Sequence, residues 1–211
     1  MGPFLRYSAS MPIAAPIVAA VIEAGRFLDR HGWVPATAGN ISHRLPDGTI
    51  AITRSGVHKG RLMPSDVIAV TAAGTPLDPA QRPSAETLLH CQIYAAIPAT
   101  QAILHGHSIA GTVLSMTTPG PALHFAQYEV LKAFEGQATH DTTLTLPMLD
   151  NDQDMPRLAA ALAPVLPGAA MGYLIRGHGT TMWAESMDAA MARLEAIEFL
   201  LACELTKRTI R

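Results

Sequence analysis

The stretch Gln101-Ala-Ile-Leu-His-Gly-His-Ser108 indicates both how this chain folds and what chemistry it carries. Residues 101–104 are mainly apolar and predict a short buried strand, in which alternate side chains point to the same face of a sheet. His105 and His107 therefore point together, with Cα atoms about 6.6 Å apart at two strand rises. Ser108 is a favoured N-cap residue, so we expect a helix to follow the two histidines.

A third histidine stands in a comparable setting, because His178 lies in Arg176-Gly-His-Gly179, directly after a strand predicted at residues 171–176. Glycines on both sides of it allow backbone or ligand to approach closely. Three imidazoles can hold one divalent metal and leave a fourth position open, which is typical of catalytic zinc. We therefore predict a zinc site at His105, His107 and His178. The remaining histidines are expected to be packing or surface residues: His31, His43, His58, His90, His124 and His140.

The sequence on either side of these stretches alternates between helical and extended patterns. Apolar residues at helical spacing predict helices that pack one stripe against a sheet, and Pro46-Asp-Gly48 predicts the turn of an antiparallel hairpin. The predicted helices are residues 16–30, Ser84 to about Ala96, a helix after Ser108, and Met187 to about Lys207 with Ser186 as N-cap, and the predicted strands include residues 40–44, 49–53 and 67–71. The fold class is therefore α/β, a single domain of three α/β/α layers around a central sheet that is mainly antiparallel or mixed.

Composition limits the classes of function. The 211 residues carry a formal net charge of −2 with Lys and Arg scattered along the chain, which argues against a nucleic-acid partner. The two cysteines, Cys91 and Cys203, lie in apolar helical patterns and fit a reducing cytoplasm rather than a disulfide framework. An uncharged run at residues 158–175 is broken by Pro and Gly, so no membrane segment is expected. Only 15% of residues are charged, which predicts a homo-oligomer with covered surface.

Polar turns provide candidate substrate contacts. Asn40, Ser55-Gly56 and Ser84 each lie in a turn with exposed backbone amides, which are anion donors and could converge on a phosphate. Lys59 is a candidate counter-charge. Glu86 and Glu129 are the carboxylates to weigh as acid or base groups, against the alternatives of a first-turn helix carboxylate for Glu86 and a solvated helix face for Glu129.

Taken together, these residues resemble the class II aldolases and their relatives, including the adducin head domain and the sugar-phosphate epimerases. The resemblance spans nearly the whole chain, in the family's order, through Ala38-Gly-Asn-Ile-Ser42, Thr53-Arg-Ser-Gly56, Pro83-Ser-Ala-Glu86, His105-Gly-His107 and Gly177-His-Gly179. Within the family, the chain looks most like the methylthioribulose-1-phosphate dehydratases of methionine salvage. The segments that carry this closer likeness include Ser55-Gly-Val-His-Lys59, Tyr128-Glu-Val-Leu-Lys-Ala-Phe134 and Asn151-Asp-Gln-Asp154.

The resemblance implies a class II aldolase-like domain over residues 11–211, after a disordered tail expected at residues 1–10. It implies that His105, His107 and His178 bind one Zn²⁺ per subunit, that Glu86 is a metal-proximal catalytic carboxylate and that Glu129 is the general acid/base of the dehydratase branch. The positions implied to hold the substrate phosphate are Asn40, Ser55, Gly56 and Ser84. Ala85 departs from those aldolases that carry a second serine there, so that part of the phosphate contact differs. Fourfold-symmetric tetramers with the active site near a subunit boundary are common in the family.

The implied reaction is zinc-dependent dehydration of 5-methylthioribulose 1-phosphate to 2,3-diketo-5-methylthiopentyl 1-phosphate. Loss of the C3 proton forms an enediolate, and a proton donor such as Glu129 at the C4 oxygen favours water loss over cleavage of the C3–C4 bond. One alternative is a class II aldolase or epimerase acting on another sugar phosphate. Another is a non-catalytic, adducin-like binding module, although the intact histidines argue against it.

Overall fold

The computed structural model describes residues 13–169 and 171–210, so the tail expected at residues 1–10 lies outside the described residues. Eight strands form one sheet in the order β3-β2-β1-β4-β8-β7-β6-β5. All neighbouring strands are antiparallel except β6 and β7, which run parallel. The strands are β1 (Asn40–Arg44), β2 (Ile50–Thr53), β3 (Val67–Val70), β4 (Ala102–Gly106), β5 (Ala122–Ala126), β6 (Thr143–Leu149), β7 (Gly172–Ile175) and β8 (Gly179–Ala184).

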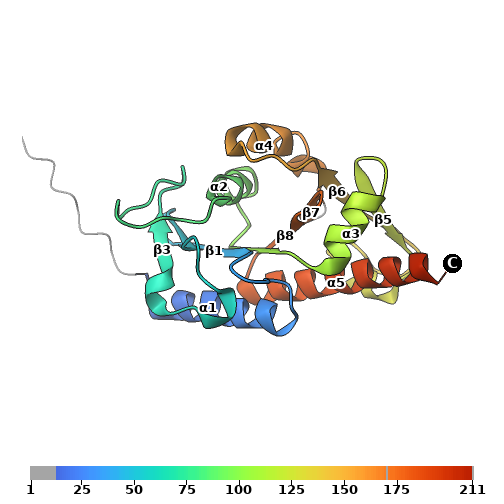
Figure 1. Cartoon of the computed structure of the whole chain (residues 1–211), viewed down its shortest axis with the longest axis horizontal. Helices are drawn as coiled ribbons and strands as arrows, with labels where there is room; N and C mark the ends of the chain where they lie inside the picture. The colour runs from blue at the N-terminus through green and yellow to red at the C-terminus, as the bar shows by residue number, and fades with distance from the viewer. Residues whose placement is uncertain (1–12, 170, 211) are drawn as a thin grey trace, which may run out of the picture.

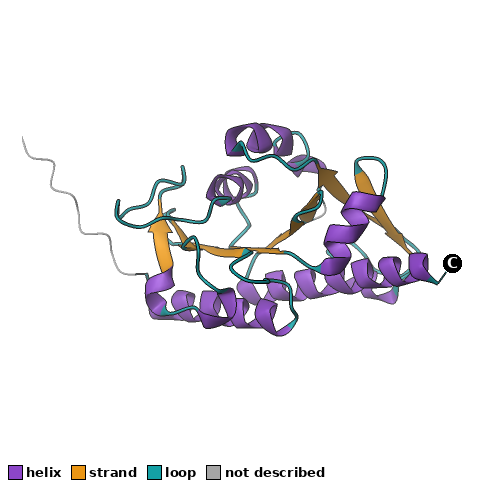
Figure 2. Ribbon diagram, viewed as in Figure 1, coloured by secondary structure: helices purple, strands orange, loops and turns teal. Residues whose placement is uncertain are grey.

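Helices cover both faces of this sheet, as Figures 1 and 2 show, with α1 and α5 below it and α2 and α4 above it in these views. The α-helices are α1 (Ala15–Arg30), α2 (Thr87–Ala96), α3 (Ile109–Thr117), α4 (Met155–Leu162) and α5 (Met187–Thr209), and the short 3-10 helices are η1 (Lys59–Arg61), η2 (Pro64–Asp66), η3 (Glu129–Ala133) and η4 (Leu166–Gly168). No described helix is long and apolar enough to cross a membrane.

Strand β4 shows how alternation divides the core into two layers. Ala102 and Leu104 pack into a cluster with side chains of α1, α3 and α5. Ile103, between them, packs into a second cluster with side chains of α2 and α4. Because alternate strand residues face opposite sides, His105 lies on the same side as Ile103. The three-layer α/β/α arrangement with a mixed, mainly antiparallel sheet confirms the predicted fold class.

Local signals predicted several elements well. The hairpin of β1 and β2 turns at Gly48, whose φ is 83°, and Ser108 and Ser186 cap α3 and α5 by accepting hydrogen bonds from Gly111 N and Ala189 N. The predicted start of a helix at Ser84 was wrong, because α2 begins only at Thr87. Before it, Pro83 forms an isolated bridge with Arg54, and Ala85 and Glu86 form a turn.

Candidate active site

Three histidines from two segments converge at the ends of central strands of the sheet. His105 is the last residue but one of β4, His107 lies in the turn between β4 and α3, and His178 lies in the turn between β7 and β8. Antiparallel pairing of β4 with β8 places the β7–β8 turn beside the end of β4. One nitrogen from each ring lies within 4.8 Å of the others, and the Nε2 atoms of His105 and His107 are 3.0 Å apart.

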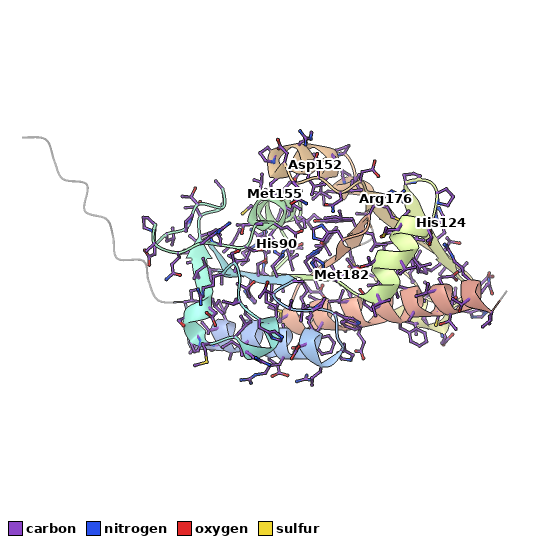
Figure 3. All side chains as sticks on the ribbon, in the orientation of Figure 1. His90, His124, Asp152, Met155, Arg176 and Met182 are labelled. Carbon is purple, nitrogen blue, oxygen red and sulfur yellow. The ribbon has the colours of Figure 1, made fainter. Side chains whose placement is uncertain are left out.

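The glycines beside His178 permit this convergence. Gly177 has a φ of 60°, in the left-handed region that favours glycine. A Cβ at Gly179 would lie 2.3 Å from the carbonyl oxygen of Gly106 and 2.9 Å from Cε1 of His105. Arg176, at the end of β7, donates to the carbonyl oxygens of Ser115 and Thr118 near the end of α3 and so ties this turn to that helix (Figure 3). Any larger residue at position 179 would displace the His105 ring.

Outer hydrogen bonds orient two of the three rings. Nδ1 of His105 is 2.9 Å from Oγ1 of Thr181, and Nδ1 of His178 is 3.3 Å from Oδ1 of Asn151. An Nδ1–H donated outward leaves the Nε2 lone pair facing the cluster. Burial lowers the pKa of His105 to about 4 and that of His107 to about 3, so both rings are neutral near pH 7.

These neutral imidazoles fit a divalent metal. Ligands at about 2.0–2.1 Å from one tetrahedral ion lie roughly 3.3–3.4 Å from each other, close to the separation of the His105 and His107 nitrogens. With both Nε2 atoms unprotonated, their facing lone pairs would repel each other, and a cation between them would remove that repulsion. The donor set therefore has the chemistry and spacing of a three-histidine metal site.

Glu86 borders this cluster as the residue before α2. Its Oε1 is 2.9 Å from Nε2 of His178, and its Oε2 is 3.3 Å from Nε2 of His105. Nδ2 of Asn40 also donates to Oε2 at 2.7 Å. Burial would raise the pKa of Glu86, but the His105 and His178 imidazoles and the Asn40 amide outweigh burial and hold that pKa well below its usual range. Glu86 is therefore an ionised carboxylate directed at the histidine cluster.

A cleft of about 370 Å³ opens over Glu86, His107 and His178. The predicted phosphate-binding turns all border it, and so does Met155 from α4 (Figure 3). Its lining also includes Asn40, Arg54, Ser55, Gly56, Lys59, Ser84 and Gln153. The convergence of these turns places polar donors opposite the histidines. Larger hollows occur elsewhere, but no further cluster of metal-ligating side chains is found in residues 13–169 and 171–210.

Lys59 gives this cleft a positive charge. Its side chain is buried, and Nζ donates to the carbonyl oxygens of Thr37 at 2.8 Å and Val57 at 2.7 Å. Burial lowers its pKa to about 8, so it stays mostly protonated near pH 7. Arg54 in the same cleft is paired with Asp66 at 2.6 Å, whereas no carboxylate of the described chain forms a salt bridge with Lys59. Lys59 is thus the cleft cation suited to an anionic ligand.

Glu129 is not brought to this cleft by its own chain. It begins η3, where its exposed carboxylate pairs with Lys132. This segment packs against α5, since Tyr128 donates to Glu204 at 2.6 Å, and α5 covers the sheet face opposite His105. His90 and His124 are not members of the cluster. His90 is buried on α2, with Nδ1 2.7 Å from Oγ of Ser42, and His124 lies on edge strand β5 (Figure 3).

Sequence reasoning missed the residues that support the rings. Thr181 reaches His105 through the register of β4 and β8, which pairs these two positions, and β8 itself was not predicted. Asn151 lies in a segment noted for its resemblance, after β6, but no local signal connects it with His178. Long-range strand register is what a single sequence does not show.

Comparisons with known proteins identify the relatives of this chain. A family model described as Class II Aldolase and Adducin N-terminal domain matches residues 19–205. The chain is 62% identical over 187 residues to methylthioribulose-1-phosphate dehydratase of Gluconobacter oxydans, covering 89% of this chain and 90% of that protein. It is 61% identical over 190 residues to the protein of that name from Gluconacetobacter diazotrophicus, covering 90% and 93%.

Among solved structures, L-fuculose-1-phosphate aldolase from Thermus thermophilus matches with a TM-score of 0.75 and 26% identity, over 92% of this chain and 96% of that one. The fold is therefore shared with an aldolase whose sequence has diverged much further than those of the dehydratases. This chain belongs to the class II aldolase and adducin family.

Proposed function

We propose that this protein is a zinc-dependent lyase that dehydrates 5-methylthioribulose 1-phosphate to 2,3-diketo-5-methylthiopentyl 1-phosphate in methionine salvage. The observation that carries the proposal is 62% identity, over 89% of the chain, to a protein named methylthioribulose-1-phosphate dehydratase. The three-histidine cluster beside an ionised carboxylate supports it. Three nitrogen ligands with an open position favour zinc.

The cleft suggests how a ketose 1-phosphate is held. The backbone and hydroxyl donors of Ser55, Gly56 and Ser84, with the Lys59 ammonium, surround space for the phosphate. Asn40 holds Glu86 through one amide hydrogen and has a second to offer the substrate. When bound by His105, His107 and His178, zinc would supply Lewis-acid polarisation of the substrate oxygens.

Two carboxylates divide the proton transfers in this proposal. Glu86 lines the cleft beside the histidine cluster and takes the C3 proton. Glu129 donates a proton to the C4 hydroxyl as it departs as water. Because η3 packs on α5, across the sheet from the site, Glu129 must come from a neighbouring copy of the chain.

An exposed apolar stripe supports such an assembly. Ile109, Val113 and Met116 occupy one side of α3 and are 78%, 37% and 69% exposed. This helix begins directly after the histidine pair, so a neighbour that covers the stripe would approach the cleft. Residues at i, i+4 and i+7 form a continuous helical face, which favours contact with another protein surface. We propose a homotetramer with sites at its subunit boundaries.

Metal analysis coupled to a product assay tests the proposal. We expect about one zinc per chain and formation of the diketone without aldehyde from methylthioribulose 1-phosphate. Aldehyde release would instead indicate an aldolase, and a purified protein without metal or turnover would indicate an adducin-like binding module. His105→Ala combined with His107→Ala is the matched variant, and a full equivalent of zinc in it would contradict the ligand assignment.

A further inference from the structure

The segments that line the cleft follow the order of the strands in the sheet. Six neighbouring strands lie in the order β2-β1-β4-β8-β7-β6, with about 4.7–4.9 Å between adjacent strands. Of the residues that line the cleft, Ser55 follows β2, Asn40 begins β1, His107 follows β4, His178 lies between β7 and β8, and Met155 comes after β6. The segment that carries Met155 therefore enters the cleft from the side of the histidines away from the proposed phosphate turn.

The substrate of the proposed function carries its groups in a matching order. Its phosphate is on C1, the oxygens next to the metal are on C2 and C3, and its methylthio group is on C5. With the phosphate at Ser55 and the C2 and C3 oxygens at the histidines, the C5 end continues past the histidines. The methylthio group is then directed toward the segment that arrives from β6, residues 150–155.

Met155 has the chemistry that such a tail requires. Among the described residues that line the cleft, it is the one large apolar side chain, because the others are polar, charged or small. It lies at the start of α4 (Figure 3) and is half-buried, since part of it packs against the core cluster shared by α2 and α4. A methionine side chain is unbranched and polarisable, so it adapts its shape to an apolar neighbour. Its accessible part fits an apolar thioether rather than a hydroxyl.

Hydrogen bonds fix the position of Met155 in the cleft. It is the first residue of α4, and Asp154 caps that helix by accepting a hydrogen bond from Arg157 N at 3.0 Å. Gln92 of α2 donates to the carbonyl oxygen of Ala159 of α4 at 2.8 Å. Because α2 directly follows the proposed catalytic carboxylate, this bond ties the helix that carries Met155 to the helix beside the site.

We propose that Met155 is a specificity-determining residue whose side chain contacts the methylthio end of the substrate. The cleft then prefers a ketose 1-phosphate with an apolar thioether at C5 over one with a hydroxyl there. The inference rests on the proposed function, because it assumes that the phosphate and the C2 and C3 oxygens are held as described above. A residue that only packs would have a different signature, since its replacement would affect both substrates alike.

The test compares dehydration of methylthioribulose 1-phosphate with that of ribulose 1-phosphate, which carries a hydroxyl at C5. Met155→Gln keeps the length of the side chain but places an amide against the tail, so we expect kcat/KM for the methylthio substrate to fall about tenfold relative to that for ribulose 1-phosphate. The volume-conserving Met155→Leu should keep most of the preference. Met63→Gln changes an exposed methionine outside the cleft and should leave both values unchanged. An unchanged preference in Met155→Gln would overturn the inference alone, whereas a wild-type protein that dehydrates neither substrate would refute the proposed function and the inference together.

Binding without turnover separates contact with the tail from an effect on the reaction. In Glu86→Gln, which is expected to keep the metal and lose the base, adding Met155→Gln should raise the Kd for methylthioribulose 1-phosphate about tenfold and leave the Kd for ribulose 1-phosphate unchanged. Isothermal titration calorimetry measures both values, and thermal melting checks that each variant is folded. Equal weakening of both ligands would show that Met155 shapes the whole cleft rather than contacting the tail, and would overturn the inference.

Discussion

Glu86 is a charged carboxylate that lies beside the three histidines but is not one of the proposed metal ligands. Its oxygens lie 2.9 and 3.3 Å from two of the imidazole nitrogens, and Asn40 holds it in this orientation. In the proposed zinc site three histidines supply the donors, which would leave the carboxylate for proton transfer. Its position before the first turn of α2 places it, largely buried, in the lining of the cleft.

We predict that Glu86→Gln removes the base without removing the metal. The amide keeps the shape and can still accept a hydrogen bond, but it cannot take a proton from C3. We expect kcat to fall about 10²–10⁴-fold, with zinc content unchanged by metal analysis. Turnover at the wild-type rate would refute the role of Glu86 as base, and loss of zinc would identify Glu86 as a ligand.

Glu198, a buried carboxyl group on α5, leads to a prediction about how the stability of the metal-free protein depends on pH. Burial raises the pKa of Glu198 in the folded protein to about 7, from an ordinary value of 4.5. The folded state therefore binds a proton at this group more tightly than the unfolded state does, which contributes stability. That contribution is fully present below about pH 4.5 and is lost as pH rises to about 7. Neither α3 nor β8, which pack against it, carries a charged side chain, and His105 of β4 faces the other side of the sheet.

We therefore expect Glu198→Gln, which does not titrate, to become more stable than wild type as pH rises from 5 to 8. The shift corresponds to about 2–3 kcal/mol at most, at 1.36 kcal/mol per pKa unit. Thermal melting with chelator present, at both pH values, measures it. An equal difference between the two proteins at pH 5 and pH 8 would count against the raised pKa.

At the scale of elements, capping and turn residues predicted structure where the signal is local. The hairpin at Gly48 and the caps at Ser108 and Ser186 depend on hydrogen bonds within a few residues. Strand β8 was not predicted, because all six of its residues are buried and its Gly-Thr-Thr start shows no alternation of apolar and polar residues. Helix α2 starts late because Pro83 forms a bridge with Arg54, and Ala85 and Glu86 then form a turn before the helix begins at Thr87.

The contact between α1 and η1 leads to a prediction, because η1 carries Lys59, which lines the cleft. A Cβ at Gly25 of α1 would lie 2.3 Å from the carbonyl oxygen of Lys59, so the helix touches the η1 backbone directly. Gly25→Ala should displace η1, destabilise the protein by about 1–3 kcal/mol and raise KM for the phosphorylated substrate by moving Lys59. Denaturant unfolding and steady-state kinetics measure the two effects. Gly168→Ala, where the added Cβ meets nothing within 4 Å, is the matched control and should change neither.

At the scale of the molecule, the sequence predicted the histidine cluster and the turns that border the cleft, but not that Glu129 would lie away from them. His105, His107 and His178 converge, and the turns at Asn40, Ser55 and Ser84 border the same cleft. These motifs lie at or near the ends of strands, and the pairing of the strands in one sheet brings those ends close together. Glu129 is different, because its segment packs on the opposite side of its own sheet, and a sequence does not show which copy of a chain supplies a residue.

Mixing two inactive variants tests whether neighbouring copies share sites. Glu129→Gln keeps the histidines, and His105→Ala with His107→Ala keeps Glu129, so neither alone should dehydrate the substrate. If each site takes its metal from one subunit and Glu129 from the next, random reassembly of equal amounts restores about a quarter of the sites. Dehydration assays after mixed refolding or co-expression should therefore show about a quarter of wild-type activity, and Glu195→Gln in place of Glu129→Gln serves as an active control. No recovery in mixed oligomers, verified by differently tagged subunits, would show that Glu129 does not act across the subunit boundary.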